Sequence, residues 1–141
     1  DGDNKRSMAY VDNICQGLLL CESAEKANGQ TYWIADERPY TMNEIMDTIE
    51  CLLEDEFNQK CAHKRMRLPS IAGDIAQLVD WSLQSIGFYN QKIHVLSEMN
   101  KTIACSIKKA QSELGYQPQI SLEEGMRRSL QWVWDTLGPL E

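Results

Sequence analysis

The chain has 141 residues, of which 43% are hydrophobic, and it contains four tryptophans. This length and composition suit one globular domain with a real core and argue against disorder. The formal charge of −7 predicts a surface that repels phosphate backbones, so nucleic acid is not expected as a partner. No apolar run approaches the ~20 residues of a membrane helix, and the charged first residues cannot form the apolar core of a signal peptide. We therefore expect a soluble protein without a membrane partner.

The cysteines are odd in number and form no Cys-x-x-Cys pair; they are Cys15, Cys21, Cys51, Cys61 and Cys105. Most lie in apolar helical patterns, which favours buried, reduced thiols and a cytoplasmic location. A metal site at Cys61 and His63 is not expected, because a structural zinc site needs four ligands and the chain has two histidines.

The N-terminal part predicts two strands and a helix. Residues 8–11 form a short apolar run that ends in Asp12, whose carboxylate can cap a helix running to about Glu22. After the Asn28-Gly29 turn, residues 31–35 are β-branched and aromatic without polar alternation, as in a strand covered on both faces. Such strands need neighbours, and two of them do not make a stable sheet alone.

Thr41-x-x-Glu44 is a capping box that opens a helix predicted to run to about Glu56. Tyr40 and Ile45 are placed to form the hydrophobic staple at its start. The predicted apolar stripe of this helix consists of Ile45, Ile49, Leu52 and Leu53.

The middle of the chain begins with a basic run, residues 60–67, which favours a strand edge kept soluble by charge over a ligand-binding patch. Ser70 can cap the next helix, which Gly87 ends. Residues 92–96 fit either a short strand or an irregular bridge. The face of the helix that we expect to be buried consists of Ile71, Ile75, Leu78, Val79, Leu83 and Ile86.

Two capped helices close the chain. Ser106 caps a short helix that ends at Gly115, and Ser121-x-x-Glu124 is a capping box opening a longer helix that ends at Gly138. The inward positions of the longer helix are Leu122, Met126, Leu130, Val133 and Leu137. Trp132 and Trp134 cannot share a helix face, so one should lie in the core and the other against a neighbouring domain or subunit.

Three ordered blocks of the sequence resemble NAD-dependent epimerase/dehydratases, the extended short-chain dehydrogenase/reductases. They are residues 6–13, residues 29–36 leading to 40–45, and the tail 104–126 with Leu114-Gly115-Tyr116-Gln117-Pro118. The family carries a glycine-rich dinucleotide loop and a Tyr-x-x-x-Lys catalytic pair in its N-terminal part, and neither occurs in this chain. The chain also starts without Met, in keeping with the back half of an enzyme.

The resemblance implies an α/β fragment, mostly helical with two or three short strands, that lacks the N-terminal glycine-rich half of a Rossmann-type enzyme. Residues 1–37 would be the last sheet-associated segments, and residues 38–141 the substrate-binding helical subdomain. The parent enzyme would use NAD(P), which this segment would not bind alone, and a missing N-terminal Rossmann domain would be its partner. Unpaired strand edges also predict a homo-oligomer.

In nucleotide-sugar members of the family, an arginine at the position of Arg6 contacts the substrate diphosphate, and Lys101 lies near the place of a second basic residue. The resemblance thus implies a small-molecule substrate, with a nucleotide sugar ahead of a small carbonyl compound or a sterol-like ligand. The chain would not be catalytic alone. The alternative is a free-standing helical protein-interaction module derived from that domain.

The acidic side chains give no sign of a catalytic carboxyl. Nothing in the sequence predicts burial or a shifted pKa for Asp36, Glu37, Asp47 or Glu50, so we expect all four to be solvated surface or helix-end charges.

Overall fold

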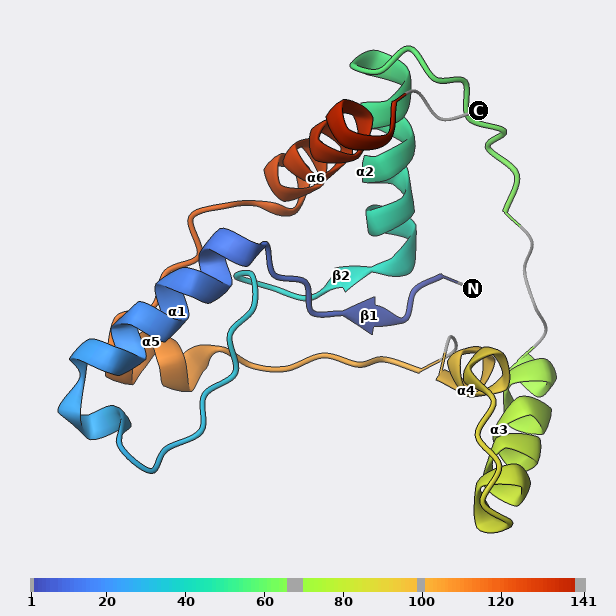
Figure 1. The fold of residues 1–141 in the computed structure, drawn as a ribbon, viewed down its shortest axis with the longest axis horizontal. Helices are drawn as coiled ribbons and strands as arrows, with labels where there is room; N and C mark the ends of the chain where they lie inside the picture. Colours follow the sequence, from blue (N-terminus) through green and yellow to red (C-terminus); the bar gives the residue numbers. More distant parts are fainter. Residues whose placement is uncertain (1, 66–69, 99–100, 139–141) are drawn as a thin grey trace.

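The computed structural model describes residues 2–65, 70–98 and 101–138. Its fold is mostly helical with two short strands, as the sequence predicts (Figure 1). In chain order, the elements are β1 (Lys5–Arg6), α1 (Val11–Ser23), a 3₁₀ turn (Glu25–Ala27), β2 (Tyr40–Thr41), α2 (Met42–Asp55), α3 (Ser70–Ser85), α4 (Gln91–Glu98), α5 (Lys108–Leu114) and α6 (Leu122–Leu137).

The two strands form a small antiparallel pair in which Lys5 lies opposite Thr41 and Arg6 opposite Tyr40. Arg6 also forms a parallel bridge with Ile103. Three segments that are far apart in sequence therefore meet around β1.

The strands predicted at residues 8–11 and 31–35 are wrong. Val11 already belongs to α1, and residues 31–35 form no ladder within the described ranges. The two segments still touch, because the Asp36 amide donates to the Met8 carbonyl at 2.7 Å. A strand needs neighbours along its length to become a ladder.

Residues 92–96 lie in a helix, so the prediction of a strand or bridge is wrong. Asn90 caps α4, since its Oδ1 accepts from the amides of Lys92 and Ile93 at 3.1 and 3.3 Å. A side-chain acceptor before the first turn indicates the start of a helix. The prediction relied on the short apolar run at residues 92–96 and did not use Asn90.

The predicted cap of α2 is confirmed, because Thr41 and Glu44 exchange both hydrogen bonds of a capping box at 3.0 and 2.7 Å. The predicted cap of α5 is wrong: its N-cap is Ile107, which makes no side-chain cap bond. Ser106 lies one residue earlier and accepts from the Lys108 amide at 3.4 Å. Gly115 ends α5 with φ +68°, a conformation that glycine adopts without a Cβ penalty.

At α6 the Ser121 half of the capping box is confirmed, because Ser121 accepts from the Glu124 amide at 3.3 Å. The predicted stop at Gly138 is also confirmed. Asp12, by contrast, is not the cap of α1: it lies in the first turn, where a carboxylate favours the helix dipole.

The main core lies where α1 and α5 pack on the extended chain at residues 32–35. Its buried residues are Ala35, Ile107, Ala110, Leu114 and Tyr116. A second packed region joins α2 and α6, whose ring pair Phe57 and Trp134 lies 5.3 Å apart between centroids. Trp132 is 65% exposed, so the two tryptophans of α6 do face different ways.

Figure 1 shows α3 and α4 set apart from the other helices and joined to them by extended chain. The buried face predicted for α3 is wrong, because its apolar side chains are largely exposed; Ala76 and Asp80 are buried instead. The predicted cap Ser70 begins α3.

All five cysteines are free thiols, and Cys15 and Cys51 are exposed, contrary to the expectation of burial. Within the described ranges, no helix is long and apolar enough to cross a membrane.

Candidate functional site

The structure brings together the two basic residues singled out in the sequence. The Arg6 guanidinium donates from Nη1 to the backbone carbonyl of Lys101, which lies 95 residues later in the chain. Backbone bonds fix this contact: the Ile103 amide donates to the Lys5 carbonyl at 2.9 Å, and the Ser7 amide donates to the Ile103 carbonyl at 3.2 Å. We call this place, formed by Arg6 and Lys101, the basic corner.

The α3–α4 hairpin contains an Asp–His pair. The Asp80 carboxylate accepts through Oδ2 from His94 Nδ1 at 2.8 Å and from Gln84 Nε2 at 2.9 Å. The hydrogen bond to His94 lowers the pKa of Asp80, and the positive charge of Lys101 lowers it further. Lys101 therefore lies within electrostatic reach of the hairpin.

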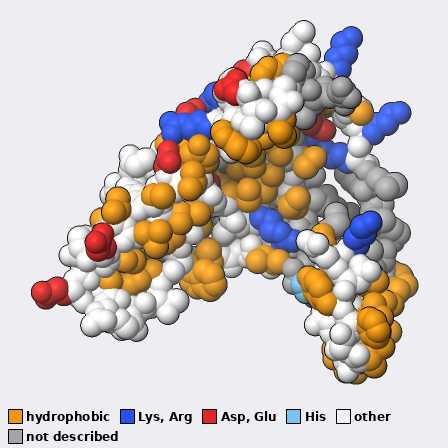
Figure 2. Space-filling model, viewed as in Figure 1, with side chains coloured by type: hydrophobic (Ala, Val, Ile, Leu, Met, Phe, Trp, Pro, Cys, Tyr) orange, Lys and Arg blue, Asp and Glu red, His pale blue; other side chains and the backbone are white. Residues whose placement is uncertain are grey.

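Lys and Arg side chains border the hollow between the larger part of the molecule and the α3–α4 hairpin (Figure 2). This local concentration of positive charge lies on a chain whose formal charge is −7. Such a corner attracts anions, and a guanidinium suits the geometry of phosphate.

Asp36 is the buried carboxyl that the sequence did not reveal. It is 5% exposed, and burial raises its pKa, although hydrogen bonds from Asn13 and Tyr40 act in the opposite direction. The Tyr40 hydroxyl also bonds to the Leu122 backbone, so this group of side chains links α1 to the starts of α2 and α6. The expectation of a solvated Asp36 is wrong.

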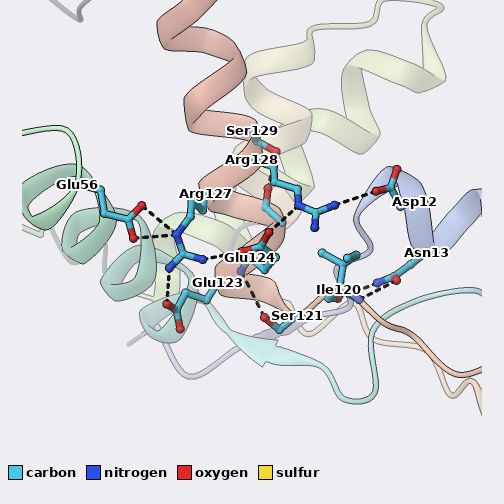
Figure 3. A network of polar contacts seen from close by, with 11 residues as sticks. Asp12, Asn13, Glu56, Ile120, Ser121, Glu123, Glu124, Arg127, Arg128 and Ser129 are labelled. Carbon is cyan, nitrogen blue, oxygen red and sulfur yellow. Dashed lines mark hydrogen bonds and ion pairs between the residues drawn. The ribbon is translucent and has the colours of Figure 1, made fainter.

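Asn13, which is 1% exposed, carries the other half of this junction. Its Oδ1 accepts from the amides of Gln119 and Ile120 at 3.0 Å. Its Nδ2 donates to Asp36 at 3.1 Å and to the Ile120 carbonyl at 2.8 Å; Figure 3 shows the bonds to Ile120. Every polar atom of the amide is used to fix the turn before α6. A buried amide with this many backbone partners acts in folding, not in ligand binding.

A small cavity of about 90 Å³ lies beside Asp36, between the starts of α1 and α6. It is lined by Met8, Ala9, Tyr10, Asp36, Ser121, Leu122, Gly125, Met126 and Ser129. Its volume is far below that of a pocket for a drug-sized ligand.

Two arginines of α6 tie three helices together (Figure 3). Arg127 binds Glu56, Glu123 and Glu124 at 2.7–2.8 Å, and Arg128 binds Asp12 at 3.0 Å. The bonds to Glu56 and Asp12 hold α6 against the end of α2 and the start of α1, so they are structural.

The basic run at residues 60–67 is not a strand edge where the structure describes it. His63 binds Glu54 at 2.8 Å, and Arg65 binds Asp47 and also Glu50, at 2.8 Å. This part of the run lies along acidic residues of α2. Asp47 and Glu50, which the sequence left without a catalytic role, are therefore ion-pair partners of Arg65. Residues 66–67 lie outside the described ranges.

The sequence lacks two motifs by which the family it resembles holds and uses a nicotinamide dinucleotide. Its eight glycines include no Gly-x-Gly pair, and no tyrosine has a lysine four positions later. The backbone cradle that holds a pyrophosphate at a helix N-terminus is therefore absent from this sequence. Within the described ranges, no three His, Cys, Asp or Glu side chains are grouped as a metal site would require.

No family model matches the chain. It is 53% identical over 131 residues to the uncharacterized protein y4nL of Sinorhizobium fredii, a match covering 93% of this chain and 37% of the relative. It is 29% identical over 144 residues to 3beta-hydroxysteroid-dehydrogenase/decarboxylase isoform 1 of Arabidopsis thaliana, covering 92% of this chain and 31% of that protein.

A solved structure shares the fold. The epimerase Mth375 of Methanothermobacter thermautotrophicus superposes with a TM-score of 0.63 at 21% identity, covering 97% of this chain and 32% of the epimerase. The chain thus spans about a third of the length of the relatives it matches. It is homologous to the C-terminal third of extended short-chain dehydrogenase/reductases of the epimerase and 3β-hydroxysteroid dehydrogenase/decarboxylase type.

Proposed function

We propose that the chain is the C-terminal substrate-binding part of a cytoplasmic NAD(P)-dependent epimerase/dehydratase-like oxidoreductase. The basic corner of Arg6 and Lys101 would hold the anionic part of the substrate, and the substrate class is a nucleotide sugar. The observation that supports this most directly is the contact between Arg6 and Lys101 across 95 residues, because the resemblance assigns phosphate contacts to these two positions.

In this proposal, the chain binds substrate, and another part of the enzyme holds the cofactor and the catalytic residues. Enzymes of this family hold the nicotinamide and the Tyr–Lys pair in the N-terminal part, which corresponds to none of these residues. When bound there, the cofactor supplies hydride transfer to or from a substrate carbon. The isolated chain binds and orients substrate without catalysing the reaction.

The corner suits this task because its backbone is fixed on both sides. β1 pairs with β2 on one edge and meets Ile103 on the other, so Arg6 needs little ordering when a ligand binds. Arg6 would engage phosphate oxygens through its planar N–H donors, and the Lys101 ammonium would add a point charge.

A hydroxysteroid-like substrate is the second candidate class. Two relatives are named 3beta-hydroxysteroid-dehydrogenase/decarboxylase, and such a ligand would require apolar surface in place of phosphate contacts. A free-standing protein-interaction module remains the alternative from a different class. In that case the exposed apolar side chains of α1, such as Leu18 and Leu19, would contact a partner protein.

The test begins with the intact mass of the protein from its natural source, against 16.2 kDa for this chain. A mass larger by a further domain of ~150 residues supports the enzyme, whereas 16.2 kDa supports the interaction module. The natural protein is then titrated with a nucleoside diphosphate by calorimetry.

Arg6→Gln and Lys101→Gln are compared with Lys26→Gln, an exposed cation in the 3₁₀ turn. We expect Arg6→Gln to weaken binding about tenfold or more, because charge-assisted bonds are worth roughly 1.5–3 kcal/mol. Lys26→Gln should change nothing. Equal affinity in all variants would refute the phosphate role. If the natural protein reduces NAD⁺ with a hydroxysteroid and binds no nucleoside diphosphate, the substrate belongs to the second class.

A further inference from the structure

Residues 59–65, which we call the α2 strap, run back along α2 from its C-terminal end. The Gln59 amide donates to the Leu53 carbonyl at 2.9 Å, so the strap starts on the last turn of the helix. Figure 1 shows this segment running from the end of α2 towards α3. The strap is therefore part of the link between α2 and the α3–α4 hairpin.

Cations of the strap face successive carboxylates of α2. His63 binds Glu54 at 2.8 Å, and Arg65 binds Glu50 at 2.8 Å and also Asp47. Two residues of extended chain span roughly 6.6 Å. Three or four residues of a helix span roughly 4.5–6 Å. Because the two spacings are similar, each cation of the antiparallel strap reaches its own carboxylate.

The imidazole of His63 lies between two of these carboxylates. Its Nε2 is 2.8 Å from Oε1 of Glu54, and its Nδ1 is 3.4 Å from Oε2 of Glu50. A neutral imidazole has one N–H, so one of its nitrogens would then turn a lone pair towards a carboxylate. The imidazolium has two N–H groups and a positive charge, so it alone can donate to both. The contact between the strap and α2 thus depends on the protonation of His63.

The neighbouring ionisable groups keep their charge when His63 titrates. Hydrogen bonds from the Cys61 amide and from His63 lower the pKa of Glu54, so it stays a carboxylate near neutral pH. Burial raises the pKa of the Cys61 thiol, which therefore stays protonated. Histidine is the side chain whose ordinary pKa lies between pH 5 and 8. The other charged residues on the strap and on the facing part of α2 are Lys60, Lys64, Arg65, Asp47, Glu50 and Asp55.

The backbone of this segment is strained at two residues. Asn58, just before the strap, and His63 within it have φ +52° and +48°, in the left-handed region. A side chain with a Cβ enters this region at a cost, although Asn and His do so more readily than most. Such a conformation persists only where surrounding contacts hold it. Weaker contacts at His63 therefore favour release of the strap.

We propose that the α2 strap is pH-sensitive: it is held on α2 while His63 is charged, and it detaches when His63 loses its proton. The chain that leads to the α3–α4 hairpin is then no longer held against α2, while α3 and α4 still pack on each other. The proposal rests on residues that the basic corner does not contain, so it does not depend on the proposed function.

The direction of the response follows from the pKa of His63. The hydrogen bond from Glu54 and the negative charge of Glu54 raise this pKa above its ordinary value of 6.5. The stabilisation from the charged ring is therefore complete below pH 6.5 and is lost as the pH rises through the raised value. We expect the strap to be attached in mild acid and detached at higher pH.

Limited proteolysis of the natural protein by trypsin measures detachment. Lys64 lies within the strap, and Lys26 in the exposed 3₁₀ turn is the reference site, so the ratio of the two cleavages cancels the pH dependence of trypsin. We expect this ratio to rise about twofold to fivefold from about pH 5.5 to about pH 8.5, as suits an exposed ion pair. In His63→Gln the ratio should not change with pH.

Two neighbouring positions of α2 give a matched pair of variants. Glu54→Gln removes the charge opposite Nε2 of His63, so the pKa of His63 should fall and the rise in cleavage should move to lower pH. Asp55→Asn is the control, because Asp55 bonds to Cys51 and not to the strap. Hydrogen–deuterium exchange at the imidazole C2, followed by mass spectrometry, gives the pKa of His63 in each variant.

Three results would overturn the proposal. The first is a cleavage ratio that is independent of pH in the wild type. The second is a rise that persists unchanged in His63→Gln, because another group would then cause it. The third is a wild-type pKa of His63 at or below 6.5, or one that Asp55→Asn lowers as much as Glu54→Gln does.

Discussion

The hydroxyl of Tyr116 donates a hydrogen bond to the backbone carbonyl of Ala35, 3.0 Å away, inside the main core. Tyr116 is fully buried and follows the glycine that ends α5, while Ala35 lies in the extended segment that remained without a ladder. The bond therefore replaces part of the pairing that a sheet would have given this segment.

Tyr116→Phe removes this bond and keeps the ring. The Ala35 carbonyl is left buried without its donor, so we expect the free energy of unfolding to fall by about 1–3 kcal/mol. Urea denaturation measures this change. Tyr89→Phe is the control, because Tyr89 is 65% exposed and its substitution should alter stability by less than about 0.5 kcal/mol.

The same tyrosine predicts a loss of stability at alkaline pH. Burial raises the pKa of Tyr116 from 10.0 to about 12. Its neutral form is favoured in the folded state, so this stabilisation is complete below pH 10 and is lost as the pH rises from 10 towards 12. Thermal melts of the wild type and Tyr116→Phe should converge over this range, and a constant difference would contradict the prediction.

Asn13 is expected to be the most sensitive polar residue of the fold. Asn13→Ala strips partners from the Gln119 and Ile120 amides and from Asp36, so we expect a loss of about 3 kcal/mol or more of unfolding free energy. Asn28→Ala, at an exposed site, is the matched control and should be near neutral. Similar losses at both sites would refute the role assigned to Asn13.

Local signals in the sequence predict the helix starts and stops well. The Thr41–Glu44 box and the Gly115 stop depend on side chains and backbone groups within four residues of each other. They can therefore be predicted from a single sequence. The same holds for the opposite faces of Trp132 and Trp134.

Features that depend on distant partners could not be predicted. Residues 31–35 carry strand propensity, yet a strand exists only where another segment pairs with it, and propensity is a weak guide to that. The apolar pattern of α3 indicates a face that requires burial, but not which surface covers it. Asp36 is buried and hydrogen-bonds to Asn13 and Tyr40, and neither residue type nor spacing gives any sign of that junction.

The residues of the candidate site also fall into those that the sequence indicates and those that only the structure reveals. Arg6 and Lys101 were found through family resemblance, and their contact is visible only in the structure. The Asp80–His94 pair was missed, because its residues lie 14 positions apart on two helices. A sequence-based search could have found it only by recognising residues 92–96 as a helix.

Gly17 predicts an unusual effect of alanine within a helix. A Cβ at this position of α1 would lie 2.9 Å from Cγ1 and Cδ1 of Ile34, so the side chain or the helix must shift. We expect Gly17→Ala to destabilise the fold by about 1–3 kcal/mol, although alanine is the better helix former by about 1 kcal/mol. In an Ile34→Ala background the same substitution should become neutral or favourable. A cost that persists in that background would show that Ile34 is not the cause.

The Asp80–His94 pair predicts a pH response confined to one part of the molecule. Because the hydrogen bond to His94 lowers the pKa of Asp80, its contribution to stability is present above the ordinary carboxyl pKa of 3.8 and is lost as the pH falls through the lowered value. Asp80→Ala should therefore speed hydrogen exchange in α3 and α4 at neutral pH while leaving α1, α5 and α6 unchanged. His63→Ala is the control, since His63 pairs with Glu54 of α2 and not with the hairpin. Faster exchange throughout the chain in Asp80→Ala would mean that the hairpin does not open as a separate unit.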